Sequence, residues 1–523
     1  MKSKQLYHIA LGFLFLIFLI TRLWRIDIIP FGLHYDEAGM AYDAWCLSQY
    51  GVDRYLNSWP LYLTNYGGGQ SILYAYLCAA LFRIFGYHSF LVRLPSILFS
   101  SLTLFFGVKI TEKLYPGKYM PALAAGILLT ICPALILQGR LGIDCYLMLG
   151  ASTVFLYLFL CAAETGKVRY YIGAGLSGGL LLYTYALTYF VLPLFLAISL
   201  FYVLWVKRFS LRGWAAMAVP MAVLAFPLIL IQIINIFDLP EMKLGCFTLT
   251  KLNMYRVSEF TGFDFSKFLS MLRMVFIGNE LSYTSAPGFF NFYILSIPLF
   301  FIGFCSLLWK AWRSIAKRKH VGSIYVLLWF LIIFLLFCNL KPIGYRISGI
   351  YFAVVAITVC GLQSLLCFLS RKKILKISLS AAFSAFYLVG FARFGFYYYM
   401  GAYTAETNPL THFDILVTEA VEYLEAHPEF QNQGTYMAEP VVYYMLSTLA
   451  SPYDVRYDIH TLDSDYYVCG SLPEIQDGYN YIVRNHLTEY AEELRRKGYT
   501  EVIFTGYSLF YQEADQNGIS NAG

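Results

Sequence analysis

The chain of 523 residues is 59% hydrophobic and 13% charged, with a mean hydropathy of +0.59 and a formal net charge of +6. A water-soluble domain cannot bury that much apolar surface, so the composition excludes the soluble fold classes and indicates a mainly α, polytopic membrane protein. Aromatic residues make up 19%, which suits belts and cavities at the membrane interface. We expect membrane lipids as partners and no nucleic acid.

Apolar runs close to the roughly 20 residues that cross the hydrocarbon predict about eleven transmembrane helices. The first run lacks a small-residue cleavage site and is expected to be a retained helix. The run at 70–85 is shorter and follows Gly67-Gly68-Gly69, so we expect an interfacial or re-entrant segment there. The expected spans are 8–24, 90–111, 119–137, 144–163, 169–186, 188–206, 213–236, 289–309, 321–339, 347–369 and 374–394.

Lys and Arg in the joints between these spans predict the orientation, because cytoplasmic loops carry an excess of both residues. With the N-terminus inside, the eleven-span topology puts all the dense basic joints on the cytoplasmic side. Counting 70–85 as a full span would invert several of them. The joints are 109–118, 167–169, 207–212, 310–319 and 371–376.

The acidic residues favour the opposite side. Residues 1–399 contain 13 Asp and Glu, and only Glu112 and Glu164 face the cytoplasm in this topology. The two long pieces of chain between spans, the loop 25–89 and the segment 237–288, also lie outside. Chemistry or binding is therefore expected at the outer face.

Composition changes after Arg393. Residues 1–399 have a net charge of +20, whereas residues 400–523, with 19 acidic and 5 basic residues, have a net charge of −14. We expect a transmembrane domain over 1–399 and a separate, soluble extracytoplasmic α/β domain over 400–523. Its expected elements are helices at 411–427 and 489–497 and strands at 479–483 and 501–504.

Four charged sequences fall on the outer face in this topology. The first is Gly32-Leu33-His34-Tyr35-Asp36-Glu37-Ala38-Gly39, in which two carboxylates stand close to a lipid boundary. Ionisable groups there are costly unless they meet a cation, a metal or a substrate. The others are Val92-Arg93-Leu94-Pro95-Ser96, the turn Gln138-Gly139-Arg140-Leu141-Gly142-Ile143-Asp144, and the turn Lys341-Pro342-Ile343-Gly344-Tyr345-Arg346.

Each sequence also has a simpler interpretation. Arg93, Lys341 and Arg346 could extend to lipid headgroups, and Asp36 or Asp144 could cap the helix that follows it. His34 and His88 are expected to be interfacial side chains, and most of the 11 cysteines small core residues. The coincidence of several charged turns on one side favours a site for a phosphate-bearing lipid.

The order of these motifs resembles that of a known superfamily. A first span followed by His-Tyr-Asp-Glu-Ala, then Arg-Leu-Pro-Ser, then Gly-Arg-Leu-Gly-Ile-Asp, is similar to the GT-C glycosyltransferases, in particular the protein O-mannosyltransferase and aminoarabinose lipid A transferase superfamily. The resemblance covers about residues 1–400. It implies a GT-C-like fold and transfer of a sugar from a polyprenyl-phosphate donor at the outer leaflet. The chain lacks the large inserted domain of the O-mannosyltransferases.

The resemblance implies roles for individual residues. Asp36 is the expected general base, Glu37 supports it, and Asp144 matches a second acid beside the first. Arg93 would contact the donor phosphate or hold the acid pair. The residues expected to bind substrate or phosphate are Arg93, Arg140, Lys341, Tyr345 and Arg346.

These roles predict a single inverting displacement at a multi-pass plasma-membrane protein. Asp36 takes the proton of an acceptor hydroxyl, and cations stabilise the leaving lipid phosphate. A divalent metal ion is left open as a cofactor, as are the sugar and the acceptor, which could be a lipid, glycan or protein. The alternatives are a transporter or flippase for a lipid-linked sugar, and an assembly factor whose acidic tail docks a partner.

Overall fold

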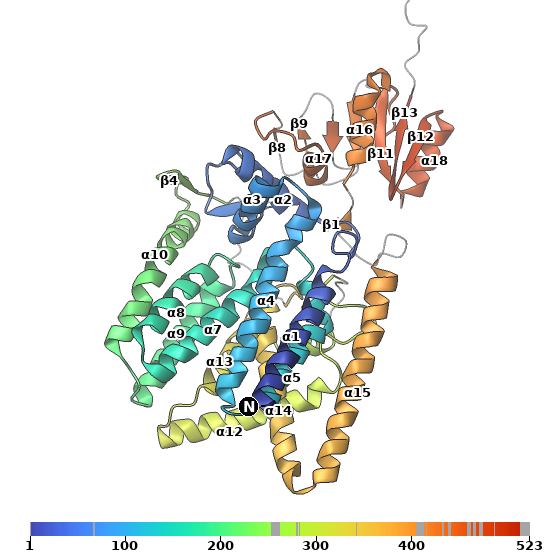
Figure 1. Ribbon diagram of the computed structural model, residues 1–523. Coiled ribbons are helices and arrows are strands. Elements are labelled where there is room, and N and C mark those ends of the chain that lie inside the picture. Colours follow the sequence, from blue (N-terminus) through green and yellow to red (C-terminus); the bar gives the residue numbers. More distant parts are fainter. Residues whose placement is uncertain are drawn as a thin grey trace, which may run out of the picture.

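The computed structural model describes residues 2–512 except 66–67, 253–261, 279–280, 282, 341, 404–412, 415, 431–433, 438–440, 455, 458–461, 464–466, 470–473 and 486. The protein is mainly helical, as predicted, with a small sheet near the C-terminus. Figure 1 shows the long helices side by side, with the sheet and the short helices α2 and α3 near one end of them.

Helices lie in each range where the sequence predicts a span. Eight of the described helices are long and apolar enough to cross a membrane, while α5 and α13 are shorter, so the count of eleven spans stays a prediction. These helices are α1 (Lys2–Leu23), α4 (Ser89–Leu114), α5 (Tyr119–Ile131), α6 (Pro133–Gln138), α7 (Leu147–Thr165), α8 (Val168–Leu181), α9 (Thr188–Trp205), α10 (Leu211–Ile236), α12 (Ser296–Lys317), α13 (Ser323–Phe337), α14 (Tyr351–Phe368) and α15 (Lys373–Tyr397).

Two prolines explain where the observed helices differ from the expected runs. The run 119–137 is split at Cys132, which has extended backbone angles because the next residue is Pro133. The run 289–309 becomes helical only at Ser296, which places Pro298 in the first turn, where its missing N–H is not needed. Before that helix, Asn291 donates from Nδ2 to the carbonyl of Met274, 17 positions earlier in the chain.

Helices α12 and α14 pack backbone to backbone at two glycines. A Cβ placed on Gly361 would lie 1.7 Å from the carbonyl oxygen of Leu299, and one on Gly303 would lie 1.9 Å from that of Ile357. Any side chain at either position would push the two helices apart. Small residues at such contacts are typical of membrane helices, where packing drives association.

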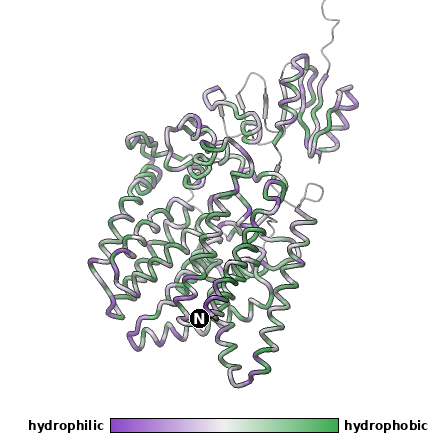
Figure 2. The backbone as a smooth tube through the Cα atoms, viewed as in Figure 1, coloured by the Kyte–Doolittle hydropathy of each residue, from purple (hydrophilic) through white to green (hydrophobic). Residues whose placement is uncertain are grey.

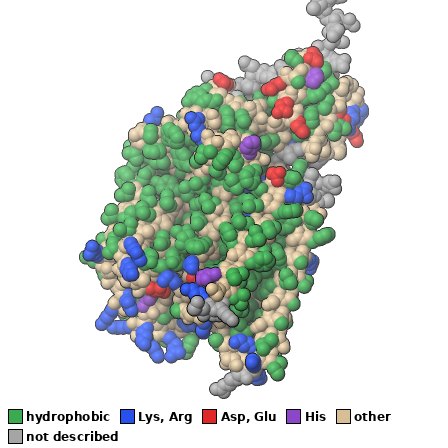
Figure 3. Space-filling model, viewed as in Figure 1, with side chains coloured by type: hydrophobic (Ala, Val, Ile, Leu, Met, Phe, Trp, Pro, Cys, Tyr) green, Lys and Arg blue, Asp and Glu red, His purple; other side chains and the backbone are tan. Residues whose placement is uncertain are grey.

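Surface hydropathy agrees with a membrane location. Figure 2 shows hydrophobic residues along the long helices and hydrophilic residues at their ends and over the C-terminal region. On the visible face in Figure 3, Lys and Arg gather at the end where the N-terminus lies, below a broad hydrophobic surface. This clustering of positive charge matches the basic joints that the sequence predicts as cytoplasmic.

The opposite end of the bundle carries short elements from the two long loops. In the first loop, α2 (Tyr35–Tyr50) and α3 (Leu73–Phe85) flank the hairpin of β2 (Tyr62–Asn65) and β3 (Gly68–Ser71). The 13-residue helix α3 accounts for the apolar run that the sequence assigns to an interfacial or re-entrant segment. The second loop contributes the hairpin β4 (Met242–Leu244)–β5 (Phe247–Leu249) and helix α11 (Phe265–Phe276).

The described C-terminal residues build a five-stranded sheet in the order β10-β7-β11-β13-β12. The strand–helix–strand order predicted for 479–504 is confirmed by β11 (Tyr479–Arg484), α18 (Thr488–Arg496) and β12 (Thr500–Phe504). The expected helix 411–427 is confirmed only from Thr418 to Ala426. Its predicted start is wrong, because Phe413–Asp414 form strand β6, paired with Leu33–His34. The remaining elements are β6 (Phe413–Asp414), β7 (Gly434–Met437), β8 (Arg456–Tyr457), β9 (Leu462–Asp463), β10 (Tyr467–Cys469), β13 (Tyr507–Tyr511), α16 (Thr418–Ala426) and α17 (Val441–Thr448).

This C-terminal region contacts the first loop directly. Strand β6 pairs antiparallel with β1 (Leu33–His34), immediately before the predicted acid pair. The hydroxyl of Tyr443 donates to the carbonyl of Leu33 at 2.8 Å, and that of Tyr42 donates to the carbonyl of Ala450 at 2.7 Å. The chain segment that bears Asp36 is therefore held by residues some 400 positions later.

Candidate active site

Asp36 lies in the first turn of α2, which His34 caps. The Nδ1 atom of His34 accepts from the backbone N–H of Asp36 at 3.1 Å, and the backbone N–H of His34 donates to Glu37 at 2.9 Å. This reciprocal pattern is a capping box in which His replaces the usual Ser or Thr. The side chain of His34 is 1% exposed, so it is a buried cap and not the interfacial side chain that the sequence suggested.

The Asp36 carboxylate is oriented by the β2–β3 hairpin. The side-chain amide of Asn65 donates to Oδ1 of Asp36 at 2.7 Å. Asp36 remains 21% exposed, in contrast to Glu37, which is fully buried. A carboxylate that is positioned yet accessible is what a base acting on a bound hydroxyl requires.

Glu37 and Arg93 form a buried ion pair. The Nε atom of Arg93 lies 3.3 Å from Oε1 of Glu37, and neither side chain is more than 2% exposed. Arg93 also donates to the carbonyls of Ile26, Pro30 and Gly32, all in the chain leading into β1. These contacts fit the alternative in which Arg93 holds the acid pair.

Arg140 is engaged by backbone carbonyls. Its Nη1 and Nη2 atoms donate to four carbonyl oxygens at the end of α1 and just beyond it, those of Thr21, Arg22, Trp24 and Ile29. The residue has no exposed surface. Its geometry therefore supports a role in terminating α1 and gives no support to the predicted contact with a donor phosphate.

Asp144 lies at the start of η1, a single 3-10 turn (Asp144–Tyr146) that leads into α7. Its Oδ1 atom accepts from the backbone N–H of the next residue, Cys145, at 2.8 Å, but Asp144 is not the N-cap of η1 or of α7, so the simpler interpretation as a helix cap is wrong. Its Oδ2 atom accepts from the backbone N–H of Ser71 at 3.1 Å. The β2–β3 hairpin thus contacts both predicted acids, Asp36 through Asn65 and Asp144 through Ser71.

The late turn approaches the same two acids. Lys341 lies outside the described residues, but Tyr345 and Arg346 are described and half-buried. Burial raises the pKa of the Tyr345 phenol, the Arg346 guanidinium lowers it, and the Asp36 carboxylate raises it again, so all three groups lie within electrostatic reach. Ser348, two residues beyond Arg346, donates from its hydroxyl to the carbonyl of Cys145 at 2.8 Å.

Tyrosine rings lie beside Asp36, Tyr345 and Arg346. The rings of Tyr283 and Tyr345 are stacked with centroids 6.4 Å apart, and that of His34 lies 4.8 Å from Tyr283. Burial raises the pKa of Tyr283, and the Tyr345 phenol and the Asp36 carboxylate raise it further. Aromatic walls exclude water and strengthen the electrostatic interactions between the groups that they enclose.

The hairpin also carries polar atoms that lack partners. Asn65 Oδ1, Gln70 Oε1 and Ser71 Oγ are buried without a hydrogen-bond partner among the described residues. Leaving such atoms unsatisfied costs about 1–3 kcal/mol each. The strand register pairs Leu63 with Gln70 and Asn65 with Gly68, so Asn65 and Gln70 are diagonal neighbours on the same face of the hairpin.

Sequence reasoning missed Asn65, Gln70 and Ser71. Only the glycine run 67–69, interpreted as the entry to a short apolar segment, marked this part of the chain. In the described residues no group of three or more His, Cys, Asp or Glu side chains is placed to hold a metal ion. The acids that could contribute to one are Asp36 and Asp144.

Comparison with known proteins supports the resemblance. Residues 69–234 match the family model described as dolichyl-phosphate-mannose-protein mannosyltransferase. No curated protein sequence matches the chain. The crystal structures of ArnT from Cupriavidus metallidurans, apo and bound to undecaprenyl phosphate, have a TM-score of 0.56 and 10% identity to this chain. The bound structure covers 97% of this chain and 98% of ArnT, and the apo structure 98% of each.

A further solved structure is the archaeal oligosaccharyltransferase AglB from Archaeoglobus fulgidus, in complex with an inhibitory peptide and a dolichol-phosphate. It has 14% identity and a TM-score of 0.49, and the match covers 81% of this chain and 58% of AglB. The family match over residues 69–234 supports a membrane glycosyltransferase, and the ArnT structures show the same fold. The resemblance to the GT-C superfamily of O-mannosyltransferases and ArnT-type enzymes is thereby confirmed.

Proposed function

We propose that this chain transfers a sugar from a polyprenyl-phosphate donor to an acceptor hydroxyl at the outer face of the plasma membrane. The observation that carries the proposal is a continuous set of contacts from Asp36 to Arg346. The His34 ring lies beside both Asp36 and Tyr283, the Tyr283 ring stacks on that of Tyr345, and the Arg346 guanidinium lies 5.9 Å from the Tyr345 ring centroid. The carboxylate can accept the proton of a hydroxyl, and the guanidinium and the phenol can bind a departing phosphate.

The reaction proposed is a single displacement. Asp36 takes the proton of the acceptor hydroxyl as its oxygen bonds to the anomeric carbon, and the bond from that carbon to the lipid phosphate breaks. Arg346 stabilises the charge left on the phosphate, and Tyr345 donates to one of its oxygens. Because the acceptor attacks from the side opposite the phosphate, the anomeric configuration inverts.

On the basis of their contacts, we propose two roles for the sequence-predicted residues. Asp36, Asp144, Tyr345 and Arg346 are assigned to substrate. Lys341, in the same turn, keeps its predicted role at the donor phosphate. Three residues position the chain around them: Glu37, Arg93 and Arg140. Because their donors and acceptors engage each other or the backbone, replacing one of these three is expected to reduce stability along with activity.

The proposal is tested with purified protein in detergent and radiolabelled polyprenyl-phosphate sugars. Loss of sugar from the lipid, in the presence of a crude acceptor extract, identifies the donor and establishes transfer. The same assay with EDTA determines whether a divalent metal is required, and the anomeric configuration of the product tests the single displacement. Binding of the donor without loss of sugar across the panel would contradict the proposal in favour of a transporter.

The hairpin contact gives a specific prediction. Asn65→Ala is expected to lower kcat/KM for transfer by about tenfold, because the Asp36 carboxylate loses a charge-assisted hydrogen bond that orients it. The control is Asn339→Ala, which removes an amide that donates to the carbonyl of Leu335 on α13. Equal activity of the two variants in the donor assay would show that Asn65 does not position the base.

A further inference from the structure

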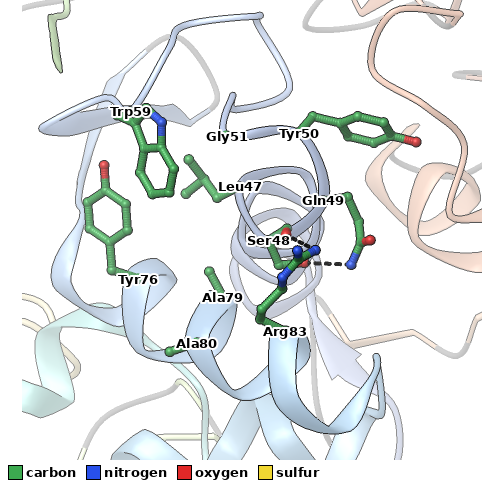
Figure 4. Close-up of a pocket in the computed structure, with 10 residues that line it drawn as sticks. All are labelled: Leu47, Ser48, Gln49, Tyr50, Gly51, Trp59, Tyr76, Ala79, Ala80 and Arg83. Atoms are coloured by element: carbon green, nitrogen blue, oxygen red, sulfur yellow. Dashed lines mark hydrogen bonds between the residues drawn. The ribbon is translucent and has the colours of Figure 1, made fainter. Parts of the chain in front are cut away.

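The structure contains a second recess that the proposed reaction does not use. It lies between the C-terminal end of α2 and α3 and has a volume of about 510 Å³, within the range of small-molecule sites (Figure 4). Its lining comes from the last turn of α2, the chain after it and one side of α3. The lining includes Ser48, Gln49, Gly51, Trp59, Tyr76 and Arg83.

The recess is separate from the candidate active site. Asp36 lies in the first turn of α2 and Ser48 to Tyr50 in the last, and the helix has 16 residues. At a rise of 1.5 Å per residue, the two ends are about 20 Å apart. One monosaccharide cannot contact both, so a ligand in the recess binds independently of the reacting group.

One wall of the recess is a fixed aromatic surface. The rings of Trp59 and Tyr76 are stacked, with centroids 6.1 Å apart and planes inclined by 15°. The Tyr76 hydroxyl donates to the carbonyl of Pro60 at 2.8 Å, and the backbone N–H of Trp59 donates to the carbonyl of Gly51 at 2.9 Å. Trp59 is nevertheless 41% exposed, so its indole is held in place but open to a ligand.

The backbone is shaped to present this indole. Trp59 has a φ of +41°, in the left-handed region that a tryptophan rarely adopts. Gly51, at a φ of +71°, leaves room for it, because a Cβ there would lie 3.0 Å from the indole nitrogen. Backbone strain of this kind persists where the surrounding structure enforces it, which is common at ligand sites.

The other wall is polar and basic. Figure 4 shows Arg83 and Gln49 across the recess from Trp59 and Tyr76. Arg83 donates from Nη1 to the carbonyl of Ser48 at 3.3 Å, and Gln49 donates from Nε2 to the hydroxyl of Ser48 at 3.0 Å. In the described part of the chain Arg83 forms no ion pair, and it is exposed, so its remaining donors can face an anion.

We propose that this recess binds a pyranose ring that carries a phosphate or another anionic group. The C–H face of the pyranose lies on the Trp59 and Tyr76 rings, its hydroxyls meet Gln49, and the anion meets the guanidinium of Arg83. An interfacial aromatic belt would account for the rings alone, without an open recess that faces the exposed guanidinium of Arg83. The ligand chemistry is common to a soluble acidic glycan and to the headgroup of a glycolipid.

A soluble acidic glycan and a glycolipid headgroup would make different contacts with the C-terminal end of α3. Ile84 and Phe85, next to Arg83, are 72% and 61% exposed. These side chains would meet the acyl or prenyl chain of a glycolipid and would contact nothing in a soluble glycan. The test therefore includes both forms of the ligand.

The test measures binding by saturation-transfer NMR, with the full chain in nanodiscs and glucose 1-phosphate and glucose as probes. Inorganic phosphate, which has no carbon-bound protons, is titrated as a competitor of glucose 1-phosphate. We expect the ring protons of glucose 1-phosphate to receive magnetisation, with weaker binding of glucose and of inorganic phosphate. Trp59→Leu and Arg83→Gln should each weaken binding of glucose 1-phosphate by about tenfold. The matched controls Trp309→Leu and Arg313→Gln, exposed residues of α12, should leave it unchanged.

Three outcomes overturn the proposal: unchanged binding in both Trp59→Leu and Arg83→Gln, inorganic phosphate binding as tightly as glucose 1-phosphate, or abolition of binding by Asp36→Asn. The last would place the signal in the candidate active site. Retained binding in an inactive Asp36→Asn protein supports the second site whatever the reaction is. A lipid-linked glucose phosphate that binds much more tightly than the free one, in an Ile84-dependent manner, would identify the ligand as a glycolipid.

Discussion

Replacing Asp36 by asparagine is expected to lower kcat for sugar transfer by about a thousandfold. Asparagine has the same shape and can still accept from the amide of Asn65, so the helix and the hairpin should keep their positions. It cannot take a proton, and general-base catalysis contributes about 10²–10⁴ in rate. The KM for the donor should change little, because Arg346 and Tyr345, and not Asp36, are proposed to bind the phosphate.

The measurement is the loss of labelled sugar from the polyprenyl-phosphate donor at saturating acceptor. Asp27→Asn serves as the control, since Asp27 is an exposed carboxylate in the same loop, outside the convergence of Asp36 and Arg346. Near-normal turnover of a correctly folded Asp36→Asn protein would remove Asp36 from the role of base, and Asp144→Asn would then be the next variant to assay.

The second large effect is on stability. Arg93→Met is expected to lower the free energy of unfolding by about 3–5 kcal/mol, because it leaves the Glu37 carboxylate buried without its cation. The backbone carbonyls of Ile26, Pro30 and Gly32 lose their donor at the same time. Melting can be followed with a thiol-reactive dye, since Cys46 and Cys78 are buried in the folded protein.

A double variant separates the two causes of that loss. Glu37→Gln added to Arg93→Met removes the uncompensated charge, so it should recover part of the melting temperature, while the unsatisfied carbonyls keep the rest of the deficit. The control is Lys109→Met, which breaks a partly exposed pair with Glu112 and should shift melting little. A melting temperature of Arg93→Met equal to that of Lys109→Met would show that the Glu37–Arg93 pair does not stabilise the fold.

Much of the helical architecture could be predicted from the sequence, because the hydrocarbon fixes the length and polarity of a span. The exceptions arise from local chemistry that hydropathy does not measure. Helix α12 begins at Ser296 since Pro298 needs a first-turn position, and it extends to Lys317 because its last turns carry their basic residues into the interface. Strand β13 was missed, since the short segment Tyr507–Tyr511, with Ser508 as its one polar residue, has no regular alternation.

The site residues named from the sequence stay a prediction, and the sequence did not distinguish their roles. Arg140 and Arg346 look alike in sequence, each a basic residue in a tight outer turn. Only the structure shows that Arg140 donates to four carbonyls around the end of α1. The Arg346 guanidinium instead lowers the pKa of Tyr345, which the Asp36 carboxylate raises. The sequence did not indicate Asn65 for a related reason. A side-chain amide in a loop carries no functional signal until its hydrogen-bond partner, Asp36, is known.

The pairing of β1 with β6 has a consequence for biosynthesis. Leu33 leaves the ribosome early, whereas its strand partner Asp414 follows some 380 residues later, after α15 has been made. At translation rates of about 5–20 residues per second, the segment that bears Asp36 waits tens of seconds for that strand. A nascent chain released before β6 would carry every predicted site residue without the strand that pairs beside Asp36.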